Sequence, residues 1–187
     1  MMVLLAPTAF ADEDNHWYVV AAAGPSNFRD FCSIAQKQTA VDSCDDESVG
    51  WQVLLGRTFG KMLAVEAGYI DTGEATAYES GGSGTMKLQS QLLALTGLFS
   101  VPIGKLSLFA KLGGVYYDAE TRFTGGFSSA TGLASKQETG IGTTFGGGAE
   151  WNFSRRFAFR AEYAGFDIQN VWQGDSELVM LGLRINF

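Results

Sequence analysis

The C-terminal stretch Glu177–Phe187, ELVMLGLRINF, decides the fold because its side chains alternate strictly in character. One set of alternate positions is apolar, and the other carries a cation and an amide: the first set is Val179, Leu181, Leu183, Ile185 and Phe187, and the second is Leu178, Met180, Gly182, Arg184 and Asn186. Alternation over this length predicts a β-strand whose two faces meet different surroundings. A soluble barrel or sandwich would turn the apolar face inward, whereas a membrane barrel would turn it outward to lipid.

Composition limits the chain to one domain and restricts its partners. The 187 residues leave room for a single domain, and 24 Gly and 14 Phe with an 18% charged fraction suit a β-rich protein. The formal net charge is -7, and the 13 Lys and Arg are scattered apart from Arg155-Arg156, which argues against nucleic acid as a partner. No apolar run approaches the roughly 20 residues of a spanning helix, so a membrane interpretation must rest on strands.

The N-terminal residues 1–11 resemble the end of a secretory signal peptide. They are apolar and close with Ala9-Phe10-Ala11, a small-x-small pattern that suits cleavage before Asp12. The positively charged beginning of such a signal is missing, so we expect a longer precursor, a remnant of the signal at 1–11 and a mature domain at 12–187. The alternative is a disordered apolar terminus.

Export would place Cys32 and Cys44 in an oxidising compartment, where two nearby thiols in one loop are expected to pair. The alternative is two free thiols. A metal site would need further ligands, and the single histidine, His16, lies far from both cysteines in the strand pattern. The sequence therefore predicts a disulfide, and it indicates neither a metal nor a cofactor.

Alternating segments recur along the chain and predict eight strands. They span 15–24, 49–59, 63–71, about 87–101, 106–117, 139–153, 157–166 and 177–187. The connections are alternately long and polar (25–48, 73–85, 118–137 and 167–176) and short (Gly60-Lys61, Pro102-Ile103-Gly104 and Ser154-Arg155-Arg156). This alternation places every short turn at one end and every long loop at the other, which is typical of an outer-membrane barrel.

Charges and aromatic rings decide which face meets lipid. Five charged residues lie opposite the apolar rows of their strands: Glu66, Lys111, Glu150, Arg160 and Glu162. The apolar rows bring aromatic residues together at the short-turn end, where a lipid-facing girdle is favoured: Trp17, Trp151, Phe153, Phe157, Phe159 and Phe187. We therefore predict an all-β fold, an eight-stranded antiparallel up-and-down transmembrane barrel with short periplasmic turns and long extracellular loops. Eight strands enclose only their own side chains, so the inward charges must pair in a packed, polar lumen.

Six short segments resemble the N-terminal transmembrane barrel of the OmpA family. They are Asn15-His16-Trp17-Tyr18, Leu95-Thr96 through Pro102, Lys111-Leu112-Gly113-Gly114, Gly147 to Trp151, Arg160-Ala161-Glu162-Tyr163 and Leu181 to Phe187. The resemblance covers nearly the whole mature chain and implies a Gram-negative outer-membrane location. Larger members of the family add a periplasmic peptidoglycan-binding domain. This chain ends at Phe187, so we expect neither that domain nor its activity.

The resemblance also implies roles for individual residues. The family pairs an inward Glu on the third strand with an inward Arg on the seventh, and Glu66 and Arg160 match them; Lys111 and Glu150 match further inward charges. The family's switch lysine would fall at Leu98, which cannot form an ion pair with Glu66. Gating by exchange of the ion-pair partner of Glu66 is therefore not expected. A static set of ion pairs is favoured over a gate. Phe187 resembles the signal that the barrel-insertion machinery recognises.

Several functions fit these features. The leading hypothesis is a non-enzymatic integral outer-membrane protein with a plugged lumen, surrounded by membrane lipid and lipopolysaccharide, that supports envelope integrity and makes surface contacts through its loops. The alternatives are a small gated pore, a lipid-modifying enzyme and a secreted lipocalin-like barrel with an apolar interior. An enzyme needs a nucleophile and a base, but His16 is interpreted as an interfacial residue without a neighbouring Ser.

Trp172 either contacts a partner or packs on the barrel. The acidic residues of the loops disfavour direct attachment to anionic polymers without divalent cations; they include Asp42, Asp45, Asp46, Glu47, Glu74, Glu79 and Asp175.

Overall fold

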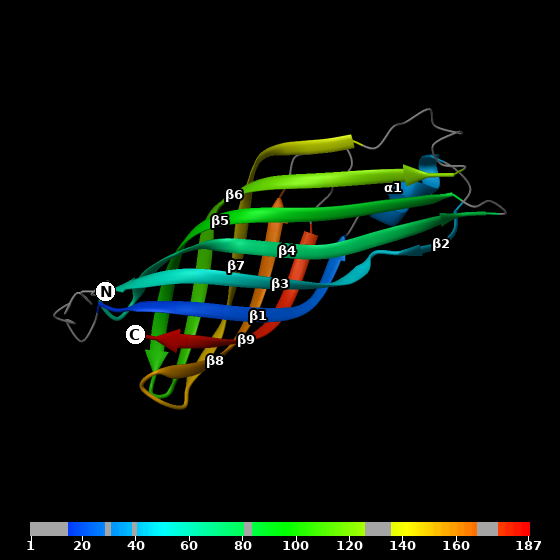
Figure 1. The fold of residues 1–187 in the computed structure, drawn as a ribbon. Coiled ribbons are helices and arrows are strands. Elements are labelled where there is room, and N and C mark those ends of the chain that lie inside the picture. Colours follow the sequence, from blue (N-terminus) through cyan, green and yellow to red (C-terminus); the bar gives the residue numbers. More distant parts are fainter. Residues whose placement is uncertain (1–14, 29–30, 39–40, 81–83, 126–135, 168–175) are drawn as a thin grey trace, which may run out of the picture.

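The computed structural model describes residues 15–28, 31–38, 41–80, 84–125, 136–167 and 176–187, and these form nine strands and one short helix (Figure 1). In chain order the elements are β1 Trp17–Phe28, α1 Phe31–Gln38, β2 Val41–Asp45, β3 Glu47–Phe59, β4 Leu63–Glu79, β5 Thr85–Ile103, β6 Leu106–Thr124, β7 Lys136–Asn152, β8 Phe157–Asp167 and β9 Ser176–Asn186. No described helix is long and apolar enough to cross a membrane.

Eight of the strands close into an antiparallel barrel. Their order is β4-β3-β1-β9-β8-β7-β6-β5, and pairing between β4 and β5 closes the ring. β2 is not part of the ring, and it pairs with residues 76–79 of β4. The predicted eight-stranded up-and-down barrel is thus confirmed. The prediction of residues 25–48 as a loop was wrong, because the segment contains the end of β1, α1, β2 and the beginning of β3.

Three short turns join β3 to β4, β5 to β6 and β7 to β8 at one end of the barrel, where β1 begins and β9 ends (Figure 1). Gly60 and Gly104 lie in the first two of these turns with φ of 72° and 67°. This left-handed region is open to glycine at little steric cost, which allows the chain to reverse within a few residues. The predicted positions of the short turns are confirmed.

At the opposite end the strands continue beyond the predicted boundaries. β4 extends to residue 79 instead of 71, β6 extends to residue 124 instead of 117, and β5 and β7 begin at residues 85 and 136. The prediction that 73–85 and 118–137 lie largely outside the sheet was therefore wrong for most of their described residues. Their Gly, Ser and Thr content suggested loops, but the backbone pairing between β4, β5 and β6 continues through them.

The outward face of the barrel changes from apolar to polar at one level. On β5, outward Leu93 and Leu95 are 59% and 61% exposed, whereas the outward positions toward the long connections hold polar residues such as Gln91. The same change crosses the neighbouring strands in register, because Tyr69, Leu93 and Tyr116 form one row and Asp71, Gln91 and Asp118 the next. An aromatic row beside a polar row marks the outer edge of an apolar band that suits lipid.

The interior contains two apolar clusters at different heights. The first lies at the height of the apolar band and includes Tyr18, Val20, Leu54, Ile70, Leu92, Phe109, Val115, Phe166, Leu178 and Met180. The second cluster lies in the part of the barrel beyond the apolar band. We call this part of the barrel the extension. The second cluster comprises Phe28, Phe31, Ala35, Ala75, Ala77, Met86, Leu88 and Phe123, with Cys32, Val41 and Cys44 packed against it. The prediction of a polar lumen was therefore wrong for these two layers, whose interior is apolar. The buried charges of the lumen form a network described below, and uncharged polar side chains such as Ser26, Thr72 and Ser90 are also buried.

The predicted disulfide between Cys32 and Cys44 is present and joins α1 to β2, with the two Cα atoms 5.8 Å apart. Phe31 and Ala35 of α1 are buried against the second cluster. The disulfide therefore holds the helix over the apolar interior of the extension.

Candidate functional site

Arg160 on β8 is the centre of a buried ion-pair network inside the barrel. Its Nη1 and Nη2 atoms lie 2.5 and 3.1 Å from the two carboxylate oxygens of Glu66 on β4. Nη1 is also 3.2 Å from Glu150 Oε1 on β7, and Nε is 2.6 Å from Glu162 Oε2 on β8. The guanidinium carbon lies 4.2 Å from the centroid of the Phe109 ring. The rigid fork of guanidinium donors suits such a site, and here it joins three carboxylates.

Lys111 and Gln52 complete the surroundings of Glu162. Lys111 Nζ on β6 forms an ion pair with Glu162 Oε1, and Gln52 Nε2 on β3 donates to Glu162 Oε2 at 3.3 Å. The structure thus brings all five charged residues singled out in the sequence into one connected set, and each is at most 4% exposed: Glu66, Lys111, Glu150, Arg160 and Glu162.

Arg184 on β9 also belongs to the network, although sequence reasoning did not assign it there. Its Nη1 donates to Glu150 Oε2 at 2.8 Å, and its guanidinium carbon lies 3.6 Å from the ring centroid of Tyr18. The Tyr18 hydroxyl in turn donates to Glu66 Oε1 at 2.8 Å. The available signal was that Arg184 lies on the same face of its strand as Asn186, opposite the apolar row that turned out to face outward.

The network is balanced in charge. Three carboxylates face three cations: Glu66, Glu150 and Glu162 against Lys111, Arg160 and Arg184. Removing ions from water is costly, so buried ions are stable only when partners and hydrogen bonds replace the lost hydration. Each carboxylate here has at least one cation within an ion-pair distance, and the set connects β4, β6, β7, β8 and β9 across the lumen.

Leu98 occupies the position where the family resemblance would place a switch lysine. It lies on β5, is 4% exposed, and is in register with Ala64 on one side and Lys111 on the other. An apolar side chain cannot offer Glu66 a second ion pair. Lys111, the nearest cation in register, is already paired with Glu162.

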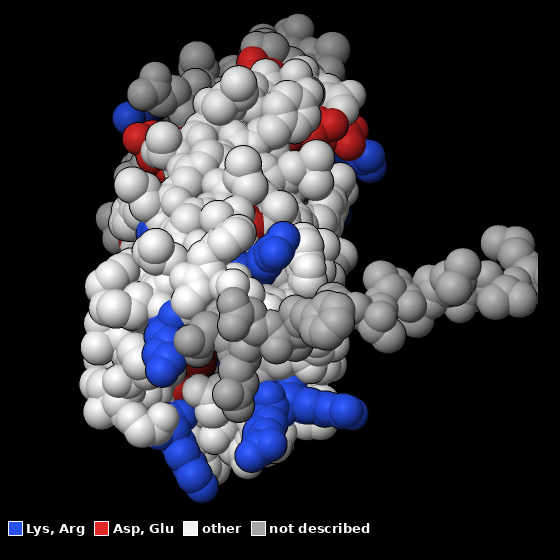
Figure 2. Space-filling view, turned by 90° about the vertical axis from the view of Figure 1, so that its left-hand side faces the viewer, with Lys and Arg blue, Asp and Glu red and all other residues white. Residues whose placement is uncertain are grey.

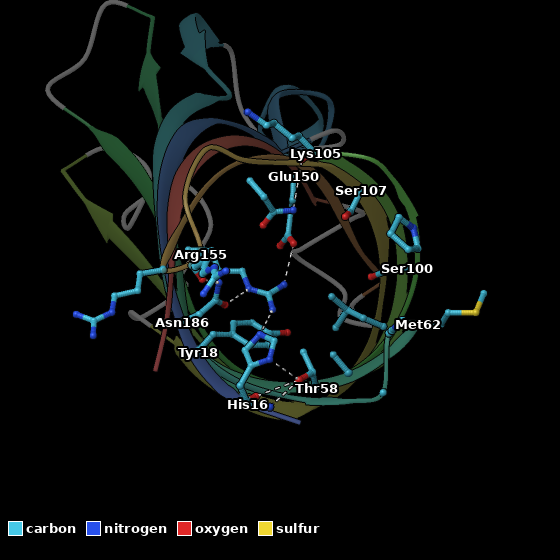
Figure 3. A pocket seen from close by; sticks show the side chains of 18 of the residues that line it. His16, Tyr18, Thr58, Met62, Ser100, Lys105, Ser107, Glu150, Arg155 and Asn186 are labelled. Carbon is cyan, nitrogen blue, oxygen red and sulfur yellow. Dashed lines mark hydrogen bonds and ion pairs between the residues drawn. The ribbon is translucent and has the colours of Figure 1, made fainter. Parts of the chain in front are cut away.

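A cavity of about 980 Å³ leads from the short-turn end to the network. Figure 3 shows it with Tyr18, His16 and Thr58 on one wall and Glu150 on the opposite wall. Four exposed cations line its mouth: Lys61, Lys105, Arg155 and Arg156. On the face shown in Figure 2, Lys and Arg side chains gather toward this end, and acidic side chains lie mainly toward the other. A chain with a net charge of -7 therefore has a basic short-turn end.

His16 does not stand alone, because the structure places Thr58 beside it. The Thr58 hydroxyl lies 3.2 Å from His16 Nδ1 and also bonds to the backbone N and O of His16, at 2.9 and 3.2 Å. His16 Nε2 is 3.2 Å from Arg184 Nη2. Partial burial and the Arg184 charge lower the pKa of His16. A guanidinium in the place of an orienting carboxylate would disfavour the imidazolium that a general base must become, so this pair is poorly suited to activating the hydroxyl.

The predicted aromatic residues lie on the outer surface at the short-turn end. Five of them are 38–69% exposed: Trp17, Trp151, Phe153, Phe157 and Phe187. Phe153 contacts Phe159 and Phe157, with ring centroids 4.7 and 6.1 Å apart. Trp17 lies apart from this group, with the Arg57 guanidinium 5.3 Å from its ring centroid. Trp172 and residues 1–11 lie outside the described residues.

The sequence matches the family model of the OmpA-like transmembrane domain over residues 12–187. The chain belongs to this family. It is 28% identical to outer membrane protein A of Klebsiella pneumoniae over 155 residues, which are 82% of this chain and 44% of that protein. It is also 28% identical to outer membrane protein A of Yersinia pseudotuberculosis over 170 residues, which are 90% of this chain and 45% of that protein. The OmpA-like chain thus spans less than half the length of these relatives.

Solved outer-membrane barrels share the fold of this OmpA-like domain. The N-terminal β-barrel domain of Pseudomonas aeruginosa OprF superposes with a TM-score of 0.60 at 11% identity, covering 92% of this chain and 98% of that one. Ail of Yersinia pestis, in complex with the heparin analogue sucrose octasulfate, gives a TM-score of 0.57 at 16% identity, covering 93% and 99%. Membership of this family places the chain in the bacterial outer membrane, which excludes the secreted lipocalin-like alternative.

Among the residues that the structure describes, no group of His, Cys, Asp or Glu side chains is arranged to hold a metal ion.

Proposed function

We propose that this OmpA-like domain is a non-enzymatic structural barrel with a lumen closed to ions, which supports the outer membrane and makes contacts at the cell surface through its extension. The observation that carries the proposal is the Arg160 side chain, which is completely buried and bridges Glu66, Glu150 and Glu162 across the barrel. An ion crossing the lumen would have to separate these pairs within a poorly solvated interior.

A second layer supports the closed state. Toward the extension the interior is filled by apolar side chains that include Leu54, Ile70, Leu92, Phe166 and Met180, each 2% exposed or less. Ions do not enter an apolar layer without water. The cavity at the short-turn end would therefore admit water only as far as the network.

A static network is favoured over a gate because the described partners are already engaged. Leu98 offers Glu66 no charge, and Lys111 is paired with Glu162. Opening would thus require the loss of a buried pair without a replacement, which costs roughly 3–5 kcal/mol.

Conductance in planar bilayers tests the closed lumen. We expect the refolded, purified domain to give no unitary currents above those of a protein-free bilayer at either polarity. Leu98→Lys, which would give Glu66 a second cation, serves as the comparison because it provides the missing exchange partner. Reproducible unitary currents from the unchanged protein would contradict the proposal. Currents from Leu98→Lys alone would support it.

A release assay tests the non-enzymatic part of the proposal. The domain is incubated in micelles with phospholipid and with lipid A, and freed fatty acid is measured against His16→Gln. We expect no turnover from either protein, because His16 Nε2 faces Arg184. Turnover that is lost in His16→Gln would revive the lipid-modifying enzyme.

The surface-contact part of the proposal concerns the extension and its acidic character. Asp45, Glu47, Asp118 and Glu120 lie there, and the cations Lys87 and Arg122 are paired with Glu74 and Glu120. Such a surface repels polyanions. Sucrose octasulfate, the heparin analogue in the Ail complex, should therefore not bind to this surface without divalent cations. Titration calorimetry with sucrose octasulfate in a chelator-containing buffer tests this, and binding that persists when Lys61, Lys105, Arg155 and Arg156 of the short-turn end are all replaced by Gln would contradict it.

Assembly offers a further test of the proposed membrane role. Phe187 is 69% exposed at the end of the barrel, and the Phe187 amide donates to the Trp17 carbonyl at 2.9 Å. We propose that it is read by the barrel-insertion machinery. Phe187→Ala should slow assembly in cells, followed by the heat-modifiable band on unboiled gels, but leave spontaneous refolding into detergent nearly unchanged. If Phe187→Ala slowed assembly in cells and refolding into detergent equally, Phe187 would have a role in folding only.

A further inference from the structure

An apolar groove crosses the lipid-facing surface of strands β6 to β9. It encloses about 740 Å³ and is lined by Leu106, Ala149, Trp151, Phe159, Ala161 and Leu181, among others. The groove lies within the apolar band, so the medium outside it is lipid, and its occupant must be apolar where it contacts the protein.

The pairing of the strands explains the depression. Ala149 on β7 lies opposite Ala161 on β8, and Ala161 lies opposite Leu181 on β9. Two methyl side chains thus form the floor. One row closer to the short turns, Trp151 lies opposite Phe159, with ring centroids 6.2 Å apart, and these rings form a wall. Leu181, which is 71% exposed, stands on the other side of the floor. A gap of this kind leaves its lining without van der Waals partners unless a chain fills it.

Three cations lie on the turns that join these same strands. Lys105 is in the turn between β5 and β6, and Arg155 and Arg156 are in the turn between β7 and β8. The Lys105 carbonyl accepts the Asn152 amide at 2.8 Å, and the Arg156 carbonyl accepts the Asn186 amide at 2.8 Å, which fixes both turns to neighbouring strands. All three side chains are exposed, and none of them is in an ion pair with another residue that the structure describes. Figure 2 shows Lys and Arg side chains gathered toward this end of the barrel.

The separation of groove and cations matches one leaflet of a bilayer. Ala161 follows Arg156 by five residues along β8, which corresponds to about 16 Å of strand and about 12 Å along the membrane normal at the usual tilt. The hydrocarbon of one leaflet is about 15 Å thick. A lipid with its phosphate at the turns would therefore place the middle of an acyl chain at Ala149 and Ala161.

We propose that this surface is a binding site for an anionic phospholipid of the periplasmic leaflet. One acyl chain lies in the groove over Ala149 and Ala161, against the rings of Trp151 and Phe159, and the anionic headgroup lies against Lys105, Arg155 and Arg156. The inference rests on the outer-membrane location and is independent of whether the lumen is closed.

A second copy of the chain is a poorer occupant. Two copies in one membrane share the same orientation, so a symmetric contact over the groove would bring both sets of Lys105, Arg155 and Arg156 together. Juxtaposed like charges oppose such a contact. An anionic headgroup instead neutralises them.

Quenching of tryptophan fluorescence by brominated lipid tests the site in the folded domain. Trp17→Phe, Trp51→Phe and Trp172→Phe together leave Trp151 as the single fluorophore. The protein is refolded into phosphatidylcholine vesicles that contain equal minor fractions of either dibrominated phosphatidylglycerol or dibrominated phosphatidylcholine. We expect the anionic lipid to quench Trp151 about fivefold more effectively, because several cations act on one headgroup.

Two variants separate the headgroup from the chain. Lys105→Gln with Arg155→Gln and Arg156→Gln should reduce the selectivity to near one, while Lys61→Gln, on another short turn, should leave it unchanged. Ala149→Leu with Ala161→Leu fills the groove and should weaken quenching by both lipids, whereas Ala67→Leu, an exposed lipid-facing alanine on β4, should not. Unboiled electrophoresis verifies that each variant is folded.

Three outcomes would overturn the site. Equal quenching by the two lipids would show no headgroup preference. Equal selectivity in a protein that retains Trp17 instead of Trp151 would indicate a general attraction of the basic end, because Trp17 is next to Arg57 but not to the groove. Quenching that falls as the protein-to-lipid ratio rises would assign the groove to a second copy.

Discussion

The membrane-spanning part of the barrel and its extension solve the same burial problem in opposite ways. β5 passes through both. In the spanning part its outward Leu93 and Leu95 are exposed, and the lumen they enclose contains the charges of the network. In the extension its outward residues are polar, and inward Met86 and Leu88 are at most 1% exposed. The strand keeps its alternation throughout, but the side that carries the larger apolar residues changes at the edge of the apolar band.

The medium outside the wall accounts for this difference. In lipid, apolar side chains are favoured on the outside, and polar groups are tolerated within the lumen provided that they are paired. Beyond the membrane the outer face meets water, so the strands stay together by enclosing an apolar cluster. The helix α1, which the disulfide joins to β2, adds Phe31 and Ala35 to that cluster. The two regions should therefore respond differently to the same kind of substitution.

The largest effect should come from removing the central cation of the spanning part. Arg160→Met leaves three carboxylates with only Lys111 and Arg184, and we expect a loss of roughly 3–5 kcal/mol in the free energy of unfolding. Urea titration in lipid vesicles measures it. Arg122→Met, in an exposed ion pair of the extension with Glu120, is the matched control and should leave the free energy of unfolding nearly unchanged, because water and salt screen exposed charges. Similar losses in both variants would remove the contrast between the regions.

A charge on the outer wall should distinguish the two regions next. Leu95→Arg places a cation in the lipid-facing band and should cost about 2–4 kcal/mol if Leu95 lies near the bilayer midplane, less if it lies closer to the interface. Gln89→Arg on the same strand and the same face should change stability by no more than about 0.5 kcal/mol, because it faces water near Glu74 and Glu120. A comparable cost at Gln89 would move the edge of the membrane toward the extension.

Loss of the disulfide should be confined to the extension. Cys32→Ser with Cys44→Ser opens a loop with a sequence separation of 12, which corresponds to at most about 3 kcal/mol in the chain-entropy account. We expect faster hydrogen exchange in α1 and β2 and an unchanged spanning part. Hydrogen exchange followed by mass spectrometry measures both at once. Increased exchange around Arg160 would mean that the two regions unfold together.

The smallest effect should be a pH dependence at the short-turn end. The pKa of His16 is lowered by burial and by Arg184, so the unfolded chain takes up a proton at a higher pH than the folded domain does. As pH falls below the unfolded value of about 6.5, stability should therefore decrease until the folded His16 also protonates. His16→Gln should remove this part of the slope. Parallel curves for both proteins between pH 5 and pH 8 would exclude it.

The strands and the inward charges of the spanning part were predictable because strict alternation assigns each residue to one of the two faces of its strand. Glu66, Lys111, Glu150, Arg160 and Glu162 were all placed inside by phase alone. Arg184 lies on the polar face of β9 by the same rule but was not assigned to the network, because its ion-pair partner Glu150 is on β7, and β8 lies between these two strands. Its other contact, Tyr18, is on the neighbouring strand β1, in register with Asn186.

The extension could not be predicted for a physical reason. There the outward residues become polar, as at Asp118, Glu120 and Arg122, while small residues such as Ala75 and Ala77 occupy part of the interior. Alternation between polar and small residues resembles a loop in sequence. The helix α1 has only eight residues, and its place is set by the disulfide and by the second cluster.

The pairing of β2 with residues 76–79 of β4 affects how the protein behaves on a crowded surface. β3 leaves β4 after Asp71, so the backbone N–H and C=O groups of the upper part of β4 would otherwise face water on that side. An open strand edge is a template for pairing with another chain. By covering this edge and being held there by the disulfide, β2 removes a route by which neighbouring barrels could adhere through their backbones.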